Sequence, residues 1–190
     1  MPNWCENYVV IKSEDKGYLQ MLYNSLRKDD PEFLPVLRPV PVGKKKWCNW
    51  DGSGDVTKKL DGDWDWDWCI THWGTKWDID VNNASYDGNE LHISFNSAWS
   101  PPVEALQYAA EKHGFTFEHS YYEGGMMFVG YATEDADDCY SYTYDKHPSE
   151  EVPEFLLDEF PWIQYDYEEL LEELLEEKEL EDGETKKIFG

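Results

Sequence analysis

The sequence predicts an α+β fold in which strands and helices follow one another in the order β-α-β-β-α-β. Three observations predict it: segments that alternate apolar and polar residues, two segments with helical spacing of apolar residues, and turn residues between them. A chain of 190 residues is long enough for one core and an extension. We expect a folded domain over residues 1–133 and an acidic extension of strand and helices over residues 134–190.

The first strand and the first helix precede a long connection. Residues 6–12 are rich in β-branched and aromatic side chains, which favours a strand. Ser13 can cap the segment that follows, and its apolar residues repeat with helical spacing, so a helix is predicted over residues 14–28. Four prolines and several glycines in residues 29–62 then predict a loop. This loop belongs to a proline-, lysine- and tryptophan-rich insertion over residues 29–76.

A tryptophan-rich segment and a hairpin come next. Residues 63–68 alternate aspartate with tryptophan, which suits an exposed strand, whereas residues 69–73 favour a short helix that ends at Gly74. The sequence leaves both alternatives open. Residues 77–81 and 91–95 alternate apolar with polar residues, and turn residues separate them, so they predict a β-hairpin.

The remaining elements complete the sheet. Two prolines open a helix that closes at Gly114. Strands are predicted over residues 115–119 and 126–131, and a further C-terminal strand over residues 139–144. This order is the ferredoxin-like arrangement, one antiparallel sheet with the helices on one face, here followed by an extra strand and an acidic helical extension.

Four motifs follow one another within residues 1–133. They are MPNWCEN at residues 1–7, WCI and WGTKWD within residues 68–78, FNSAWSPP at residues 95–102, and YYE before Met126 and Phe128. Together they resemble YubB-like proteins, a ferredoxin-like family encoded mainly by phages and plasmids. The resemblance implies the fold and an origin in a mobile element. It implies no catalytic residue, because the family has no established activity.

Acidic side chains dominate the end of the chain. The net charge is -25, and residues 131–190 carry 21 acidic side chains against four lysines. Such a charge repels nucleic acid and anionic membranes, and it attracts basic protein surfaces over about 8 Å at physiological salt. We therefore expect a host protein with a basic nucleic-acid-binding surface as the partner, with no direct binding of nucleic acid or membrane.

Two helical patterns, Glu150 to Phe160 and Asp166 to Asp182, are separated by Pro161. In the second pattern four leucines form an apolar stripe and acids cover the remainder. Carboxylates on a helix that rises about 1.5 Å per residue can imitate DNA phosphates, which carry one charge per about 1.7 Å of duplex. The functional hypothesis is inhibition of a host defence protein, such as a restriction enzyme or CRISPR effector. A solvating tail is the simpler alternative. The candidate partner-binding acids are Asp166, Glu168, Glu169, Glu172, Glu173, Glu176, Glu177 and Glu179.

The tryptophans are the second candidate feature. Trp64 and Trp66, with Asp65 between them, could anchor a protein partner. The alternative function is a small-ligand-binding domain that sequesters a metabolite or a signalling nucleotide, with lysines holding its phosphate. Packing in the core or at an interface is the structural use of the same residues. The candidate pocket residues are Trp4, Trp73, Lys76, Trp77, Trp99 and Tyr122.

Catalytic, metal and cofactor motifs are weak in this sequence. Cys69 and His72 lie one helical turn apart, and Cys5 and Cys48 could complete a zinc site, but buried thiols explain these residues better. The aspartates at 61, 63, 65 and 67 lack the glycine and glutamate of a calcium loop. Phosphate loops, nucleophile elbows and zinc-protease motifs do not occur. We expect a non-enzymatic protein without metal or cofactor, cytoplasmic and with reduced cysteines.

Overall fold

The structure is a computed structural model that describes residues 3–29, 31–41 and 66–189, with the side chains of the last helix described as far as Leu175. The chain forms two compact units, Met1–Cys139 and Tyr140–Gly190.

Six strands form one sheet in the order β2-β3-β1-β4-β5-β6. The central strand β1 pairs antiparallel with β3 on one side and with β4 on the other. The strands are β1 (Trp4–Lys12), β2 (Asp80–Tyr86), β3 (Glu90–Ala98), β4 (Thr116–Glu123), β5 (Phe128–Ala132) and β6 (Asp137–Ser141).

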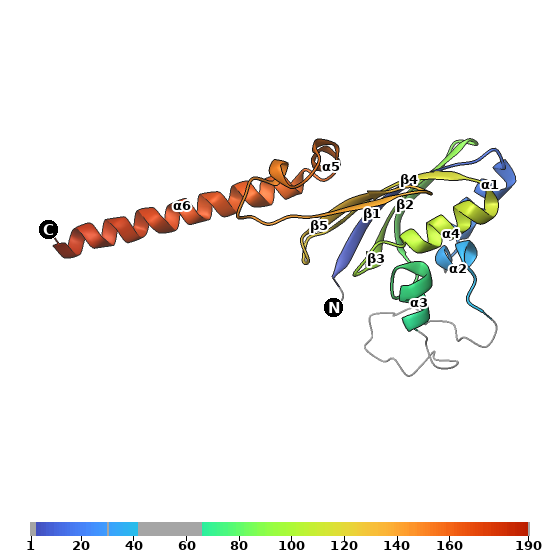
Figure 1. Ribbon diagram of the computed structural model, residues 1–190, viewed down its shortest axis with the longest axis horizontal. Helices are drawn as coiled ribbons and strands as arrows, with labels where there is room; N and C mark the ends of the chain where they lie inside the picture. The colour runs from blue at the N-terminus through green and yellow to red at the C-terminus, as the bar shows by residue number, and fades with distance from the viewer. Residues whose placement is uncertain (1–2, 30, 42–65, 190) are drawn as a thin grey trace. The chain divides into compact units, whose positions relative to one another are not determined.

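Helices α1 and α4 cover one face of this sheet (Figure 1). Alternate residues of β1 are buried on that face, as the period of two in a strand requires. The prediction of an α+β, ferredoxin-like fold is confirmed. The helices of the first unit are α1 (Lys16–Leu26), α2 (Leu34–Leu37), α3 (Trp66–Trp73) and α4 (Val103–His113).

The start of α1 differs from the prediction. The carboxylate of Asp15 accepts a hydrogen bond from the Tyr18 amide, so Asp15 caps the helix. The Ser13 hydroxyl instead accepts from the Asp15 amide. The predicted cap was therefore two residues too early, because a carboxylate at the next suitable position competes for the same free amides.

A short helix interrupts the predicted loop. Residues Leu34–Leu37 form α2 because the buried carboxylate of Asp78 accepts hydrogen bonds from the Phe33 and Leu34 amides, at 2.9 and 2.8 Å. The same carboxylate accepts from the Ile79 amide. Because Asp78 serves α2, the strand predicted from residue 77 begins only at Asp80.

The alternatives for the tryptophan-rich segment are partly decided. Helix α3 begins at Trp66 and ends before Gly74, whose φ of 86° is left-handed as predicted. Residues 63–65 lie outside the described residues. Gly114 likewise ends α4 with a φ of 70°, which confirms the predicted helix end.

The second unit contains three helical segments, η1 (Pro148–Glu150), α5 (Glu154–Glu159) and α6 (Trp162–Phe189). The first predicted helix is broken because Pro153 stands between η1 and α5. The second predicted helix is longer than predicted at both ends, because α6 starts directly after Pro161 and continues to Phe189. No helix in the described part of the chain is long and apolar enough to cross a membrane.

Candidate functional site

Helix α6 displays both charge and apolar surface. The described candidate acids are exposed, namely Asp166, Glu168, Glu169, Glu172 and Glu173. Leu171, Leu174 and Leu175 are exposed by 40%, 45% and 61%. Three of the four leucines of the predicted stripe are therefore exposed, and the fourth, Leu170, is partly buried. The backbone of α6 includes Glu176, Glu177 and Glu179, whose side chains lie outside the described part.

Three elements converge on a second surface, at one end of the sheet of the first unit. Trp4 starts β1, Trp66 starts α3 and Trp99 follows β3. All three indoles are exposed, by 41%, 46% and 37% respectively. The Trp4 ring meets the Trp77 ring edge-on at 6.5 Å. Trp64 and Asp65 lie outside the described residues.

Lys76 lies among these tryptophans. Its Nζ is 4.5 Å from the centroid of the Trp99 ring and 5.8 Å from that of Trp66. Indole faces attract cations through their quadrupole. The protein's own ammonium therefore occupies the position that a cationic ligand would take.

Trp99 has an unusual backbone. Its φ is 73°, in the left-handed region where a bulky side chain crowds the backbone. The Trp99 amide donates to the Asn3 carbonyl at 3.0 Å. The next residue, Ser100, donates through its hydroxyl to the Gly74 carbonyl. Contacts on both sides thus hold this turn in place.

Gly74 is required at that contact. A Cβ atom built at Gly74 would lie 2.6 Å from the Pro101 carbonyl oxygen, and the residue also has a positive φ. Beside it, the Thr75 hydroxyl donates to the Ala98 carbonyl and accepts from the Ala98 amide. The motif at residues 73–78 and the motif at residues 95–102 are therefore joined directly.

A chain of buried hydrogen bonds connects this turn to the core. His119 Nε2 lies 2.9 Å from Asn7 Oδ1, and Asn7 Nδ2 donates to Ser97 Oγ at 2.9 Å. Ser97 then donates to the Ser100 carbonyl at 2.8 Å. His119, Asn7 and Ser97 are each no more than 1% exposed. Buried polar groups that satisfy one another in this way rigidify a site.

Two predicted pocket residues belong to the core instead. Trp73 is fully buried, and its indole N–H donates to the Arg38 carbonyl at 2.9 Å. Tyr122 is 8% exposed. Sequence alone does not separate these aromatic residues from the exposed ones, because exposure depends on tertiary packing. Among the candidate residues, the structure brings Trp66, Lys76 and Trp99 together in one tryptophan surface, whereas Trp4 contacts Trp77.

Cys5, Asn7 and His119 superficially suggest a catalytic set. Burial raises the pKa of the Cys5 thiol well above its ordinary value, and burial lowers the pKa of His119 to about 3. Among the described residues, Nδ1 of His119 has no hydrogen-bond partner. A thiol that stays protonated is a weak nucleophile, and an imidazole of such low pKa is a weak base.

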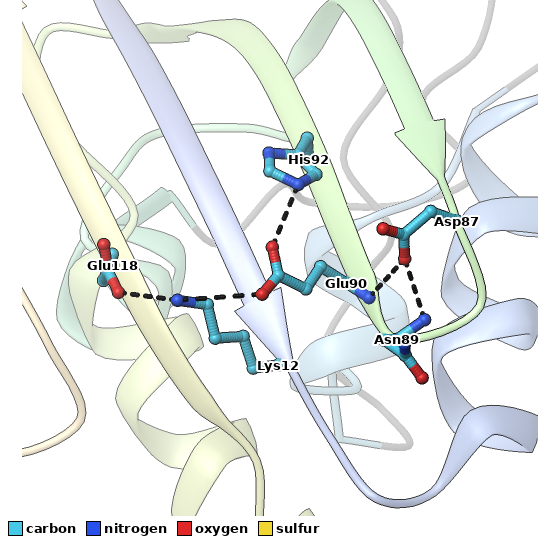
Figure 2. Close-up of polar contacts among 6 residues, drawn as sticks. All are labelled: Lys12, Asp87, Asn89, Glu90, His92 and Glu118. Atoms are coloured by element: carbon cyan, nitrogen blue, oxygen red, sulfur yellow. Dashed lines mark hydrogen bonds and ion pairs between the residues drawn. The ribbon is translucent and has the colours of Figure 1, made fainter.

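On the face of the sheet opposite α1 and α4, Lys12 contacts carboxylates, whereas Lys76 contacts indole rings. Figure 2 shows Lys12 between Glu118 and Glu90, at Nζ to Oε1 distances of 2.9 and 3.9 Å. The hydrogen bond to Glu118 raises the pKa of Lys12. His92 also lies 3.3 Å from Glu90. The Lys12 ammonium is therefore paired with carboxylates, unlike that of Lys76.

A groove of about 780 Å³ lies beside α4. Within it the guanidinium of Arg38 lies 4.4 Å from the Tyr108 ring centroid and donates to the His72 carbonyl. With four carboxylates against this one guanidinium, the groove disfavours anions. Its acids are Glu104, Glu111, Glu134 and Asp135.

The described residues contain no group of three histidine, cysteine or acidic side chains placed to hold a metal ion. Cys5 and Cys69 are buried free thiols and Cys139 is an exposed one. Cys48 lies outside the described part of the chain, so the four-ligand zinc hypothesis is not tested there.

These features define an α+β protein with a ferredoxin-like domain. Residues 72–159 match the family model described as the ferredoxin-like domain in Api92-like protein. The crystal structure of a protein api92 from Yersinia pseudotuberculosis is similar at 12% identity and a TM-score of 0.41, over 75% of this chain and 99% of that one. A comparison with curated proteins gives no match.

Proposed function

We propose that this protein binds a basic, nucleic-acid-handling defence protein of a host cell through α6 and inhibits it. The origin implied by the YubB-like motifs, a phage or another mobile element, would place it in the host cytoplasm. The observation that carries the proposal is a continuous helix, Trp162–Phe189, on which the described acids and three leucines are exposed together.

The charge spacing of α6 supports phosphate mimicry. The helix has 28 residues and, at about 1.5 Å per residue, a length of about 42 Å. Its sequence contains eleven acidic residues and three lysines, so one acid occurs per roughly 4 Å of axis. DNA carries one phosphate per about 3.4 Å of each strand. The helix therefore resembles one strand in charge density more closely than a duplex.

The leucines refine the kind of surface that α6 would meet. A groove that binds only phosphates has no use for Leu171, Leu174 and Leu175, which expose 40–61% of their surface. An amphipathic helix binds by placing such a stripe in an apolar groove. Association of α6 with a second copy is opposed by the like charges of Glu168 to Glu173 beside the stripe. A groove with an apolar floor and basic rims fits both features.

Competition with nucleic acid tests the proposal. Host proteins are captured on the full chain at low salt, and each captured nucleic-acid-binding protein is purified. Fluorescence anisotropy then measures displacement of a labelled duplex from it by the wild-type chain. Neutralising four exposed carboxylates should raise the protein concentration needed to displace half of the duplex at least about tenfold, since each carboxylate would pair with a basic group of the partner. The substitutions are E168Q, E169Q, E172Q and E173Q.

A matched variant controls for net charge. It neutralises four exposed carboxylates of the first unit and should displace the duplex as the wild type does. Equal loss in both variants, or no displacement by the wild type, would overturn phosphate mimicry by α6. The control substitutions are E14Q, D29N, D80N and E111Q.

A further inference from the structure

We propose that Trp66, Lys76 and Trp99 form a binding site for a small ligand that combines a planar ring with an anionic group, of the chemical class of a nucleoside phosphate. The site belongs to the first unit and does not depend on the function proposed for α6.

The first observation is the strained backbone of Trp99. Its φ of 73° is unfavourable for a bulky residue. The surrounding contacts maintain it: the Trp99 amide donates to Asn3, Ser97 donates to the Ser100 carbonyl, and Ser100 donates to Gly74. Strained backbone positions that a structure maintains cluster at active sites and ligand-binding positions. Here it presents an indole that is 37% exposed.

The second observation is that the Lys76 ammonium contacts two indole rings and no carboxylate of the described ranges. The chain has 41 acidic and 16 basic residues, yet within the described ranges no carboxylate lies at ion-pair distance from the Lys76 ammonium. Lys12, by contrast, contacts Glu118 at 2.9 Å (Figure 2). Lys76 therefore keeps hydrogen-bond donors that an anion can accept.

The third observation identifies the class of ligand. Because the Lys76 ammonium lies against both indoles, at 4.5 and 5.8 Å from their centroids, a cation would be repelled. A planar ring can stack on the indole surface that remains exposed on Trp66 and Trp99. An anionic group on that ring would then meet Lys76. Ring and charge together distinguish this ligand from inorganic phosphate and from a neutral nucleoside.

Isothermal titration calorimetry of the full chain tests the site. The probes are the four ribonucleoside monophosphates, their nucleosides and inorganic phosphate, at constant ionic strength. We expect at least one monophosphate to bind about tenfold more tightly than its nucleoside or than phosphate, since the ammonium adds a charge-assisted hydrogen bond. The Lys76→Gln variant should bind that monophosphate no more tightly than the nucleoside.

Lys112→Gln is the matched control. Lys112 also lies over an aromatic ring, with Nζ 5.7 Å from the Tyr108 centroid on α4. Its replacement by glutamine changes the net charge by the same amount as Lys76→Gln. This variant should keep wild-type affinity. Binding that is unchanged in Lys76→Gln, or reduced equally in both variants, would overturn the proposal.

Indole N–H signals in the NMR spectrum of the wild-type protein give a second measurement that needs no folded Lys76 variant. Trp66→Phe and Trp99→Phe assign the two signals. Addition of the tight-binding monophosphate should shift both. Shifts at other indoles alone, or no binding by any probe at millimolar concentration, would rule out this site and would favour a tryptophan surface that serves a protein partner.

Discussion

The tryptophan surface of the first unit and helix α6 of the second unit hold their exposed side chains by different means. Trp99 stands on a strained turn that buried hydrogen bonds connect to Ser97, Asn7 and His119. The carboxylates and leucines of α6 stand on a regular helix and are open to solvent. A surface that recognises the shape of a ligand needs fixed geometry, whereas a surface that acts through charge needs only a scaffold with regular spacing.

The largest expected effect separates core from helix surface. Trp73→Ala should lower the free energy of unfolding by about 3–5 kcal/mol, because it removes a fully buried indole and its hydrogen bond to Arg38. Leu174→Ala, at a side chain 45% exposed, should cost less than about 1 kcal/mol. Urea unfolding followed by circular dichroism measures both. Similar losses would mean that the leucine stripe is packed rather than exposed.

Much of this contrast was predictable, because it depends on local patterns. The β-branched and aromatic content indicated β1, and alternation indicated the hairpin of β2 and β3. Glycines indicated the ends of α3 and α4, and the leucine spacing indicated α6. Asp78 was missed because its partners Phe33 and Leu34 are more than 40 residues away in the sequence. Hydrogen bonds between distant segments leave no periodic signal.

The candidate site was predictable only in part. The sequence named Trp66, Lys76 and Trp99, which the structure brings together, and also Trp4, which contacts Trp77. It could not separate them from buried Trp73, because exposure depends on tertiary packing. Nor did composition indicate the left-handed φ of Trp99, since glycine and asparagine are the residues usually associated with that conformation.

Two buried groups near these contacts should give opposite pH dependence. His119 has its pKa lowered to about 3 by burial, below the value of about 6.5 in an unfolded chain. Between these two values the unfolded state binds more protons than the folded state. The contribution of His119 to the free energy of unfolding is therefore complete above pH 6.5 and is lost as the pH falls. When the pH is lowered from 7 to 4.5, the free energy of unfolding of His119→Gln should therefore rise by about 2–3 kcal/mol relative to that of the wild type.

Asp78 should behave in the reverse manner. Burial outweighs its three backbone hydrogen bonds and raises its pKa to about 6, from 3.8. The folded state binds more protons between these values, so the contribution of Asp78 decreases as the pH rises through this range. When the pH is lowered from 7 to 4.5, the free energy of unfolding of Asp78→Asn should therefore fall by about 2 kcal/mol relative to that of the wild type. The urea midpoints of unfolding at pH 7 and pH 4.5 test both variants. Changes of the same sign in the two variants would contradict the opposite pKa shifts of His119 and Asp78.

A smaller effect tests the strain at Trp99. Glycine has no Cβ, so Trp99→Gly should be about 1 kcal/mol more stable than Trp99→Ala, the reverse of the usual order of these residues. Thermal unfolding of the two variants provides the measurement. Equal melting temperatures would show that the turn relaxes once the indole is removed.

The smallest expected effect concerns α6. Glu172→Lys with Glu173→Lys should change the stability of the first unit by less than about 0.5 kcal/mol, because exposed charges contribute little. Unfolding monitored at the indole signals of Trp73 and Trp99 reports on that unit. A change of about 1 kcal/mol or more would mean that the two units are energetically coupled.

The hydrogen bonds that join His119, Asn7 and Ser97 have a direction, since Asn7 accepts from His119 and donates to Ser97, which donates to the Ser100 carbonyl. Exchanging one member for a residue with the wrong donor or acceptor leaves a buried polar atom unsatisfied, whereas a matched exchange of neighbours does not. Over evolutionary time, these three positions should therefore change together as a correlated set, while the exposed tryptophans vary independently of them.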